Sequence, residues 1–168
     1  MLGQEKSDIF LVYYLRPSGG TWNRTELTPE IVGMPISPSP SSQLATVAWP
    51  GRLVVYYQET DGTIQELTRS TTNNWSTKLE ALPGALAKVG TGIASTGWID
   101  NEEHIRVFYQ SQDNSLWQAA YDMDSWTEAA RLCTGADGNQ PVRAKSGSPI
   151  TAVRDGTTVG HLCRPIHS

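Results

Sequence analysis

Short segments rich in β-branched and aromatic residues run along the chain, and joints of Gly, Pro, Asn and Asp separate them. Segments 53–58 (LVVYYQ) and 105–110 (IRVFYQ) are typical of β-strands. The pairs Asp61-Gly62 and Asp113-Asn114 that follow them favour tight hairpin turns. Segment 78–88 (KLEALPGALAK) looks helical for a few residues, but Pro83-Gly84 interrupts it, which indicates the end of an outer strand and a connection. The pattern predicts an all-β chain.

The strand pattern is repeated with a period of about 50 residues, which is typical of a β-propeller blade or another β array. Tyr56-Tyr57 recur as Phe108-Tyr109, Trp75 recurs as Trp126, and Trp49 recurs as Trp98. We expect most of the recurring tryptophans to pack between blades. Each complete unit then contains four strands, predicted at 43–49, 53–58, 63–69 and 75–82 in one unit and at 92–98, 105–110, 115–121 and 126–132 in the next.

The two ends of the chain resemble parts of the same unit. Segment 9–22 aligns with 64–75, which sets Ile9 against Ile64 and Trp22 against Trp75. Segment 147–153 resembles a first strand and 157–165 a second. We therefore predict a single half-propeller domain over 1–168, with about three blades, one of them split between about 1–42 and 143–168.

Three blades are too few for an ordinary closed propeller, and open half-blades would expose unpaired strand edges. Two chains arranged head to tail would complete each other's split blades and give a six-bladed ring, a homodimer with a two-fold axis. The alternative is that the chain is a piece of a longer propeller.

The composition and the net charge argue against some classes of partner. The formal net charge is −4, so no basic stripe is available for nucleic acid, and no apolar run is long enough to span a membrane. The start of the chain shows no secretory signal, which favours a cytoplasmic or unconventionally secreted protein unless the true N-terminus is missing. Cys133 and Cys163 could pair only if the fold brings them together, and buried free thiols are the expected state. The three histidines show no metal-ligand spacing, and no cofactor is expected.

The phrase that begins at Ile105 and ends at Trp126 resembles the repeat of the fungal fucose-specific lectins. A Tyr-Tyr or Phe-Tyr strand, a turn, a third strand and a following tryptophan occur in this order twice, and the resemblance is good over residues 43–132. It implies a six-bladed propeller that binds L-fucose in pockets between adjacent blades. In that family an arginine of the second strand and a glutamate or glutamine of the third strand meet a tryptophan of the next blade.

Carried over position by position, the resemblance implies one complete pocket in this chain. Arg106 and Gln118 take the arginine and amide positions, and Trp22 of a second copy supplies the tryptophan. A second pocket keeps Glu66 and Trp126 but has Val54 in place of the arginine. We expect that pocket to be weak or altered in specificity.

The split blade is expected to hold no pocket. Leu11 falls at its acid position and Val159 near its arginine position, and Arg154 and Arg164 flank that strand without aligning with the arginine.

The chemistry of such pockets favours a non-catalytic sugar binder. An arginine beside a carboxylate or amide satisfies neighbouring hydroxyls with directional hydrogen bonds, and an indole covers the methyl group of a deoxy sugar. The predicted partners are fucosylated glycans or glycoproteins.

Two alternatives remain. One is a propeller scaffold for protein partners with degenerate sugar sites, which Val54 and Leu11 favour. The other is a propeller glycosidase, which the lack of two carboxylates placed to flank a glycosidic bond disfavours.

Overall fold

The structure, a computed structural model, describes residues 9–14, 22–27, 36–70, 75, 80–134 and 138–154, the first two ranges by their backbone only. No helix in these ranges is long and apolar enough to cross a membrane. The described residues form β-strands: β1 (Ile9–Tyr14), β2 (Trp22–Leu27), β3 (Ala45–Trp49), β4 (Arg52–Gln58), β5 (Thr63–Ser70), β6 (Glu80–Leu86), β7 (Ile93–Ile99), β8 (Glu103–Gln110), β9 (Leu116–Asp122), β10 (Ser125–Trp126), β11 (Ala130–Arg131), β12 (Cys133–Thr134) and β13 (Gln140–Pro141).

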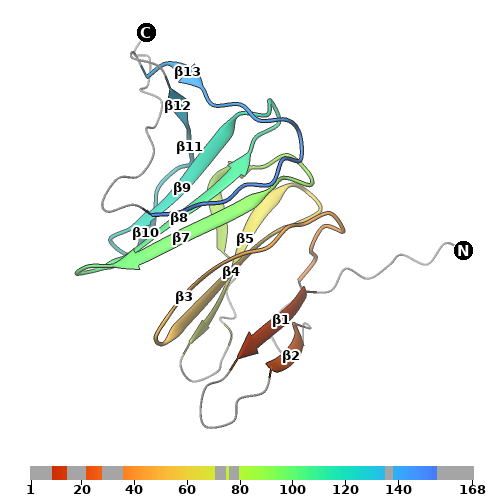
Figure 1. Cartoon of the computed structure of the whole chain (residues 1–168), viewed down its shortest axis with the longest axis vertical. Coiled ribbons are helices and arrows are strands. Elements are labelled where there is room, and N and C mark those ends of the chain that lie inside the picture. Colours follow the sequence, from red (N-terminus) through yellow and green to blue (C-terminus); the bar gives the residue numbers. More distant parts are fainter. Residues whose placement is uncertain are drawn as a thin grey trace, which may run out of the picture.

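Two antiparallel sheets correspond to the two complete repeat units (Figure 1). Blade I has the order β3-β4-β5-β6. Blade II has the order β7-β8-β9, and both β10 and β11 pair with β9 as its outer strand. The two blades lie side by side in chain order, which confirms the predicted β-propeller architecture of four-stranded units.

The hairpin turns between the second and third strands are equivalent in the two blades. Gly62 and Asn114 have positive φ angles of 92° and 63°. The preceding aspartates accept hydrogen bonds from the backbone N–H two residues on: the Thr63 N–H donates to Asp61 Oδ1 at 2.8 Å, and the Ser115 N–H donates to Asp113 Oδ1 at 3.0 Å. A side chain at Gly62 would lie 2.8 Å from the Ala87 backbone oxygen. Conformation and space both favour glycine there, as the sequence predicted.

The outer strand of each blade consists of two separate pieces. In blade I, Trp75 forms an isolated bridge to Arg69, and β6 follows. In blade II, Trp126 pairs with Tyr121, and β11 follows. Pro83-Gly84 lies inside β6, which extends to Leu86, so the extended interpretation of segment 78–88 was right but its predicted end was too early.

The main hydrophobic core lies between the two blades. Alternating residues of β4 (Val54 and Tyr56) and of β8 (Ile105, Val107 and Tyr109) belong to one cluster of buried side chains. The intervening residues of β4 face a second cluster with Leu67 and Trp75. Because successive side chains of a strand point to opposite faces, each blade presents one face to each neighbour.

A buried glutamine closes the connection after each blade. The Gln58 side chain donates to the backbone oxygens of Ala87 (3.3 Å) and Lys88 (3.0 Å) and accepts from the Gly90 N–H (2.9 Å). The Gln110 side chain repeats this pattern with Ala144, Lys145 and Gly147 at 3.1, 2.9 and 3.0 Å. These two amides therefore fix the chain where it enters the next unit.

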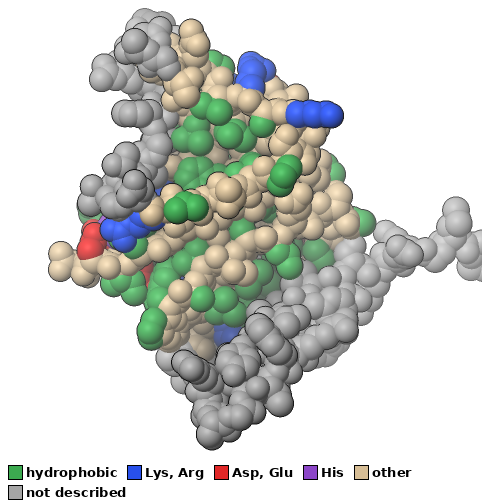
Figure 2. All heavy atoms as spheres, in the orientation of Figure 1, with side chains coloured by type: hydrophobic (Ala, Val, Ile, Leu, Met, Phe, Trp, Pro, Cys, Tyr) green, Lys and Arg blue, Asp and Glu red, His purple; other side chains and the backbone are tan. Residues whose placement is uncertain are grey.

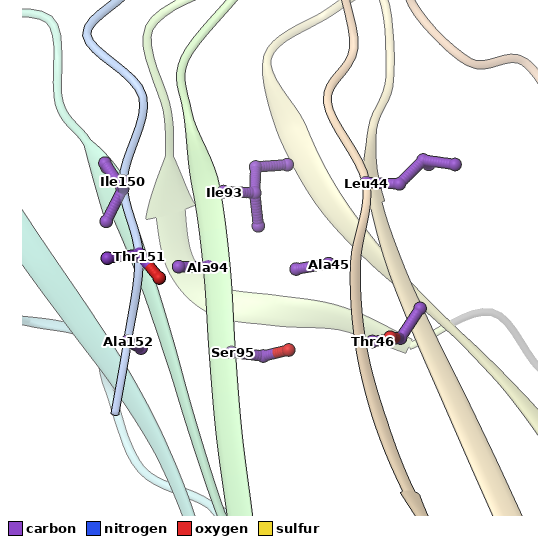
Figure 3. A pocket seen from close by; sticks show the side chains of 9 residues that line it. All are labelled: Leu44, Ala45, Thr46, Ile93, Ala94, Ser95, Ile150, Thr151 and Ala152. Atoms are coloured by element: carbon purple, nitrogen blue, oxygen red, sulfur yellow. The ribbon is translucent and has the colours of Figure 1, made fainter. Parts of the chain in front are cut away.

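Three inner segments lie side by side around an open hollow of about 200 Å³ (Figure 3). They come from β3, from β7 and from the predicted first strand near the C-terminus. Their side chains are mostly small or apolar, and Figure 2 shows hydrophobic side chains gathered on the face where β3 and β7 lie in front. The lining residues are Leu44, Ala45, Thr46, Ile93, Ala94, Ser95, Ile150, Thr151 and Ala152.

The ends are arranged in keeping with the predicted split blade. β1 and β2 form an antiparallel hairpin in which Tyr14 is opposite Trp22, as Arg69 is opposite Trp75. Segment 150–152 lies beside β7, and Ser148 and Ile150 contact the space next to Gly92. Segment 157–165 lies outside the described residues, so the split blade stays a prediction.

One cysteine differs from expectation. Cys133 is disulfide-bonded, so the predicted free thiol at this position was wrong. Disulfide formation depends on the distance between two Cα atoms in the fold, which the spacing of two cysteines along the chain does not give. Cys163 lies outside the described residues.

Candidate functional site

Arg106 lies on the face of blade II that points away from blade I. Its side chain is only 12% exposed. Nη1 donates to the backbone oxygens of Ile105 (2.8 Å) and Tyr121 (3.2 Å) and to Asp122 Oδ1 (2.9 Å). Within the described part of the chain these are all of its hydrogen bonds, so Nη2 and Nε remain for another acceptor.

Gln118 shares this face with Arg106. Gln118 is opposite Phe108 and Arg106 is opposite Ala120, so the two residues are diagonal neighbours across β8 and β9. Diagonal neighbours on one face are within reach of long side chains. Gln118 is 4% exposed, and its Oε1 has no hydrogen-bond partner among the described residues. The predicted pair thus offers free guanidinium donors and an unsatisfied amide acceptor on one face.

Trp98 adds an aromatic ring to the face. The Arg106 guanidinium carbon lies 5.0 Å from the centre of that ring, and the Arg154 guanidinium carbon lies 4.8 Å from it. His104 stacks on the same indole at 4.9 Å. Arg154 belongs to the segment that follows blade II, so this segment contributes to the face of Arg106, which the sequence alone did not predict.

The remaining predicted member of this pocket is Trp22. It begins β2 and is opposite Tyr14. Its side chain lies outside the described residues, and its place beside Arg106 and Gln118 stays a prediction.

Glu66 and Trp126 both contact Tyr56 at the junction between the two blades. Glu66 is 6% exposed and accepts hydrogen bonds from Tyr56 (3.2 Å) and Thr68 (2.8 Å). The Trp126 ring packs edge-on against Tyr56 at 6.1 Å and against Tyr121 at 5.5 Å. The structure therefore places an acid of blade I and a tryptophan of blade II around the same tyrosine, and the second pocket stays a prediction.

The cation of this junction is Arg52, which sequence reasoning missed. Arg52 lies two residues before Val54 on β4, so it shares the face of Val54 and Tyr56. Nη2 lies 3.5 Å from Glu66 Oε1, and Nη1 forms an ion pair with Glu103 Oε2 of blade II. The alternation of faces along a strand could have identified Arg52. An arginine two residues before the expected position 54 points to the same side of β4.

Electrostatics hold these groups in defined protonation states. Burial opposes the charge of Arg52, but Glu103 and Glu66 outweigh it and raise the pKa of the guanidinium. Burial, followed by the charge of Glu66, raises the pKa of Tyr56 well above its ordinary value. Tyr56 therefore stays a neutral hydroxyl that donates to Glu66, and Arg52 stays charged.

Comparison with known proteins identifies the family. The family described as "Fungal fucose-specific lectin" matches residues 12–155, most of the chain. The chain belongs to the fungal fucose-specific lectin family. The sequence resemblance is therefore confirmed.

Relatives of this fungal lectin chain agree in sequence and in fold. It is 32% identical over 114 residues to the fucose-specific lectin of Aleuria aurantia, which covers 67% of this chain and 33% of that relative. Among solved structures, a mutant of the Aleuria aurantia lectin in complex with α-methyl-L-fucoside aligns with a TM-score of 0.57 at 26% identity, covering 74% of this chain and 39% of that one.

A structure of the Aleuria aurantia lectin described as a six-bladed β-propeller aligns with a TM-score of 0.60 at 24% identity. It covers 88% of this chain and 41% of the other. The lectin-family chain thus has the fold of a partial six-bladed propeller and spans less than half the length of the proteins it matches.

Proposed function

We propose that this chain is part of a non-catalytic lectin that binds L-fucose or fucosylated glycans at the junctions between its blades. The observation that carries the proposal is the outward face of blade II. Among the described residues, Arg106 has donors left for an acceptor there, and Gln118 Oε1 is buried with no partner. Membership of the family and the complex of a relative with α-methyl-L-fucoside support the choice of sugar.

The chemistry of this face suits a neutral deoxy sugar. Arg106 would donate to one hydroxyl, and Gln118 Oε1 would accept from a neighbouring one, which removes the cost of an unsatisfied buried acceptor, about 1–3 kcal/mol. The Trp98 ring lies on the same side of the sheet and packs against the Arg106 guanidinium, which it helps to orient. None of these groups is placed as a pair of catalytic carboxylates, so the role proposed for them is binding and orientation.

We propose further that a neighbouring unit completes this face. In the homodimer that the repeat favours, Trp22 of a second copy would cover the sugar at Arg106. Light scattering tests that arrangement, and a mass near twice 18.4 kDa would support it. A well-behaved monomer that still binds sugar would instead place the ligand on blade II alone.

Calorimetric titration with methyl α-L-fucoside tests the binding proposal through Arg106→Ala. Removing a charged donor to a sugar hydroxyl should weaken binding roughly tenfold to hundredfold. Arg143→Ala is the matched control, because Arg143 is exposed and contacts Asp113 on another part of blade II. Gln118→Glu keeps an acceptor and should retain binding. Unchanged affinity in Arg106→Ala, with the fold intact, would refute the site.

A further inference from the structure

A polar network connects the Arg106 guanidinium of blade II to the solvent. Asp122 Oδ1 lies 2.9 Å from Arg106 Nη1 and 2.5 Å from His104 Nδ1, so one carboxylate oxygen contacts both side chains. His104 Nε2 in turn lies 2.9 Å from Asp100 Oδ1. The side chains of Arg106 and His104 are 12% and 14% exposed, whereas that of Asp100 is 58% exposed. The network thus begins at the proposed sugar-binding arginine and ends at the surface.

The two carboxylates require a charged imidazole between them. An ionised carboxylate only accepts hydrogen bonds, so His104 must donate from both ring nitrogens to bind Asp122 and Asp100 together. Only the protonated imidazole carries a hydrogen on each nitrogen. The hydrogen bond with Asp122 raises the pKa of His104 against the effect of burial, and Asp100 adds to the rise. Both observations favour the protonated form.

Two guanidinium groups also lie near the imidazole. His104 stacks on the Trp98 indole, and the guanidinium carbons of Arg106 and Arg154 lie 5.0 and 4.8 Å from the centre of the same ring. Glu103, which precedes His104 on β8, pairs instead with a side chain of blade I. Among the described residues, the charges close to His104 are therefore those of two carboxylates and two guanidinium groups.

The network occurs on the blade that keeps the arginine. Blade I, which has Val54 in place of the arginine, has Arg52 opposite Ser70 at the positions of the histidine and the aspartate. The first hairpin of blade II also extends one pair beyond the position that corresponds to Arg52, and its turn supplies Asp100. The histidine, both carboxylates and the arginine are thus found together in blade II, and blade I lacks all four at the equivalent positions.

We propose that Asp122 is a positioning residue of the Arg106 site, and that protonated His104, supported by Asp100, holds Asp122 in place. The inference rests on the proposed function, because it concerns the affinity of the same site. Asp122 occupies Nη1 of the planar guanidinium, which leaves Nη2 and Nε for the sugar.

The charge of the imidazole makes this positioning depend on pH. When His104 loses its proton, it can no longer donate to both carboxylates, so Asp122 is held less firmly. The positive potential at the remaining donors of Arg106 also falls, because a nearby positive charge is lost. Both changes act in the same direction. Sugar binding is therefore strongest while His104 is protonated and weakens as the pH rises.

Calorimetry with methyl α-L-fucoside tests the roles of both side chains. Wild-type affinity should fall about threefold from about pH 6 to about pH 8, roughly the range in which histidine titrates. His104→Gln is neutral at both pH values and should show no such fall. Asp122→Ala should weaken binding about tenfold at the lower pH. Asp113→Asn is the matched control, because Asp113 pairs with Arg131 and Arg143 on another part of blade II, and it should keep the wild-type affinity and pH profile.

Proton NMR of the histidines gives a second readout, which a purely structural role would not change. The chain has three histidines, and the resonance that is missing from His104→Gln identifies His104. Coupling between two binding events is reciprocal. If the sugar binds more tightly to the protonated form, saturating methyl α-L-fucoside should make His104 titrate at a higher pH.

The outcomes separate this inference from the proposed function. Wild-type affinity in folded Asp122→Ala, or a pH profile that is the same in wild type and His104→Gln, would overturn the inference and leave sugar binding intact. No binding by the folded wild-type protein would overturn the proposed function and this inference with it. If Asp122→Ala does not fold, the pH profiles and the NMR titration decide, and a titration of His104 that the sugar does not move refutes the coupling.

Discussion

The outward face of blade II and the face of blade I that packs against blade II carry the same polar groups in different order. In blade I the cation is Arg52 and position 54 is valine; in blade II the cation is Arg106 and the position two residues earlier is His104. Both faces keep an acid or amide on the third strand, Glu66 or Gln118. The cation has therefore moved by two residues, roughly 7 Å along the strand, without leaving its face.

The residue that packs on the first-strand tryptophan also differs between the two faces. In blade II, Gly97 lies so close to Trp49 that a side chain there would approach its ring to 3.0 Å. After blade II, Arg154 lies over Trp98 instead. Where the next blade packs tightly, the arginine is tied to a glutamate of that blade. On the outward face of blade II, Arg106 keeps donors that have no acceptor among the described residues.

The largest expected effect is a loss of unfolding free energy. It tests whether the blade I face at the junction is covered by protein while the outward face of blade II is open to solvent. Tyr56 is fully buried between the blades, whereas the equivalent Phe108 is half-buried on the outward face. Tyr56→Ala should lower the free energy of unfolding by about 3–5 kcal/mol, and Phe108→Ala by less than half of that. Urea denaturation of the two variants measures the difference. Equal losses would mean that the outward face is as well covered as the junction.

The next effect tests the similarity of the two connections. Gln58→Ala removes the side-chain partner of three backbone oxygens and one backbone N–H, and Gln110→Ala removes that of two backbone oxygens and one backbone N–H. Each variant should therefore lose about 2–3 kcal/mol of unfolding free energy. Denaturant titrations should give similar losses. A loss confined to Gln58→Ala would show that the connection after blade II is not held as firmly in solution.

The smallest effect uses pH to compare His104 with its counterpart Arg52. His104 lies 2.5 Å from Asp122 and 2.9 Å from Asp100 through its two ring nitrogens. The hydrogen bond with Asp122 raises the pKa of His104 against the opposing effect of burial, and Asp100 adds to the rise. The charged form is thus favoured in the folded state.

This stabilisation is fully present below the ordinary histidine pKa of 6.5 and is lost as the pH rises through the raised value. Unfolding free energy measured from pH 6 to pH 8, roughly the range in which histidine titrates, should fall in the wild type. It should fall less in His104→Gln. Since Arg52 does not titrate there, Arg52→Lys should keep the wild-type slope. Parallel curves for wild type and His104→Gln would refute the role of His104.

The repeat explains which parts of the fold and of the candidate site could be predicted from the sequence. Strand positions and the turns at Gly62 and Asn114 followed from local chemistry, and so did the extended conformation around Pro83. The shared face of Arg106 and Gln118 followed from the repeat. The roles of Gln58 and Gln110 did not, because their partners are backbone groups about 30 residues away, which carry no side-chain signature.

Arg52 and Cys133 were missed for different reasons. Arg52 stands outside the expected position and was not identified by aligning residues one by one, although the two-residue period of a strand places it on the same face as Val54. The bond at Cys133 depends on a distance in the fold. Alignment within a repeat thus predicts where a residue lies along its strand. Which side chain it bonds to can be predicted only once it is known how the faces of neighbouring blades pack together.

A crystal structure with methyl α-L-fucoside tests the central claim most directly. The account predicts a sugar on the outward face of blade II, with oxygens within hydrogen-bond distance of Arg106 Nη2 or Nε and of Gln118 Oε1. A sugar bound elsewhere, with Arg106 and Gln118 as they are now, would contradict it.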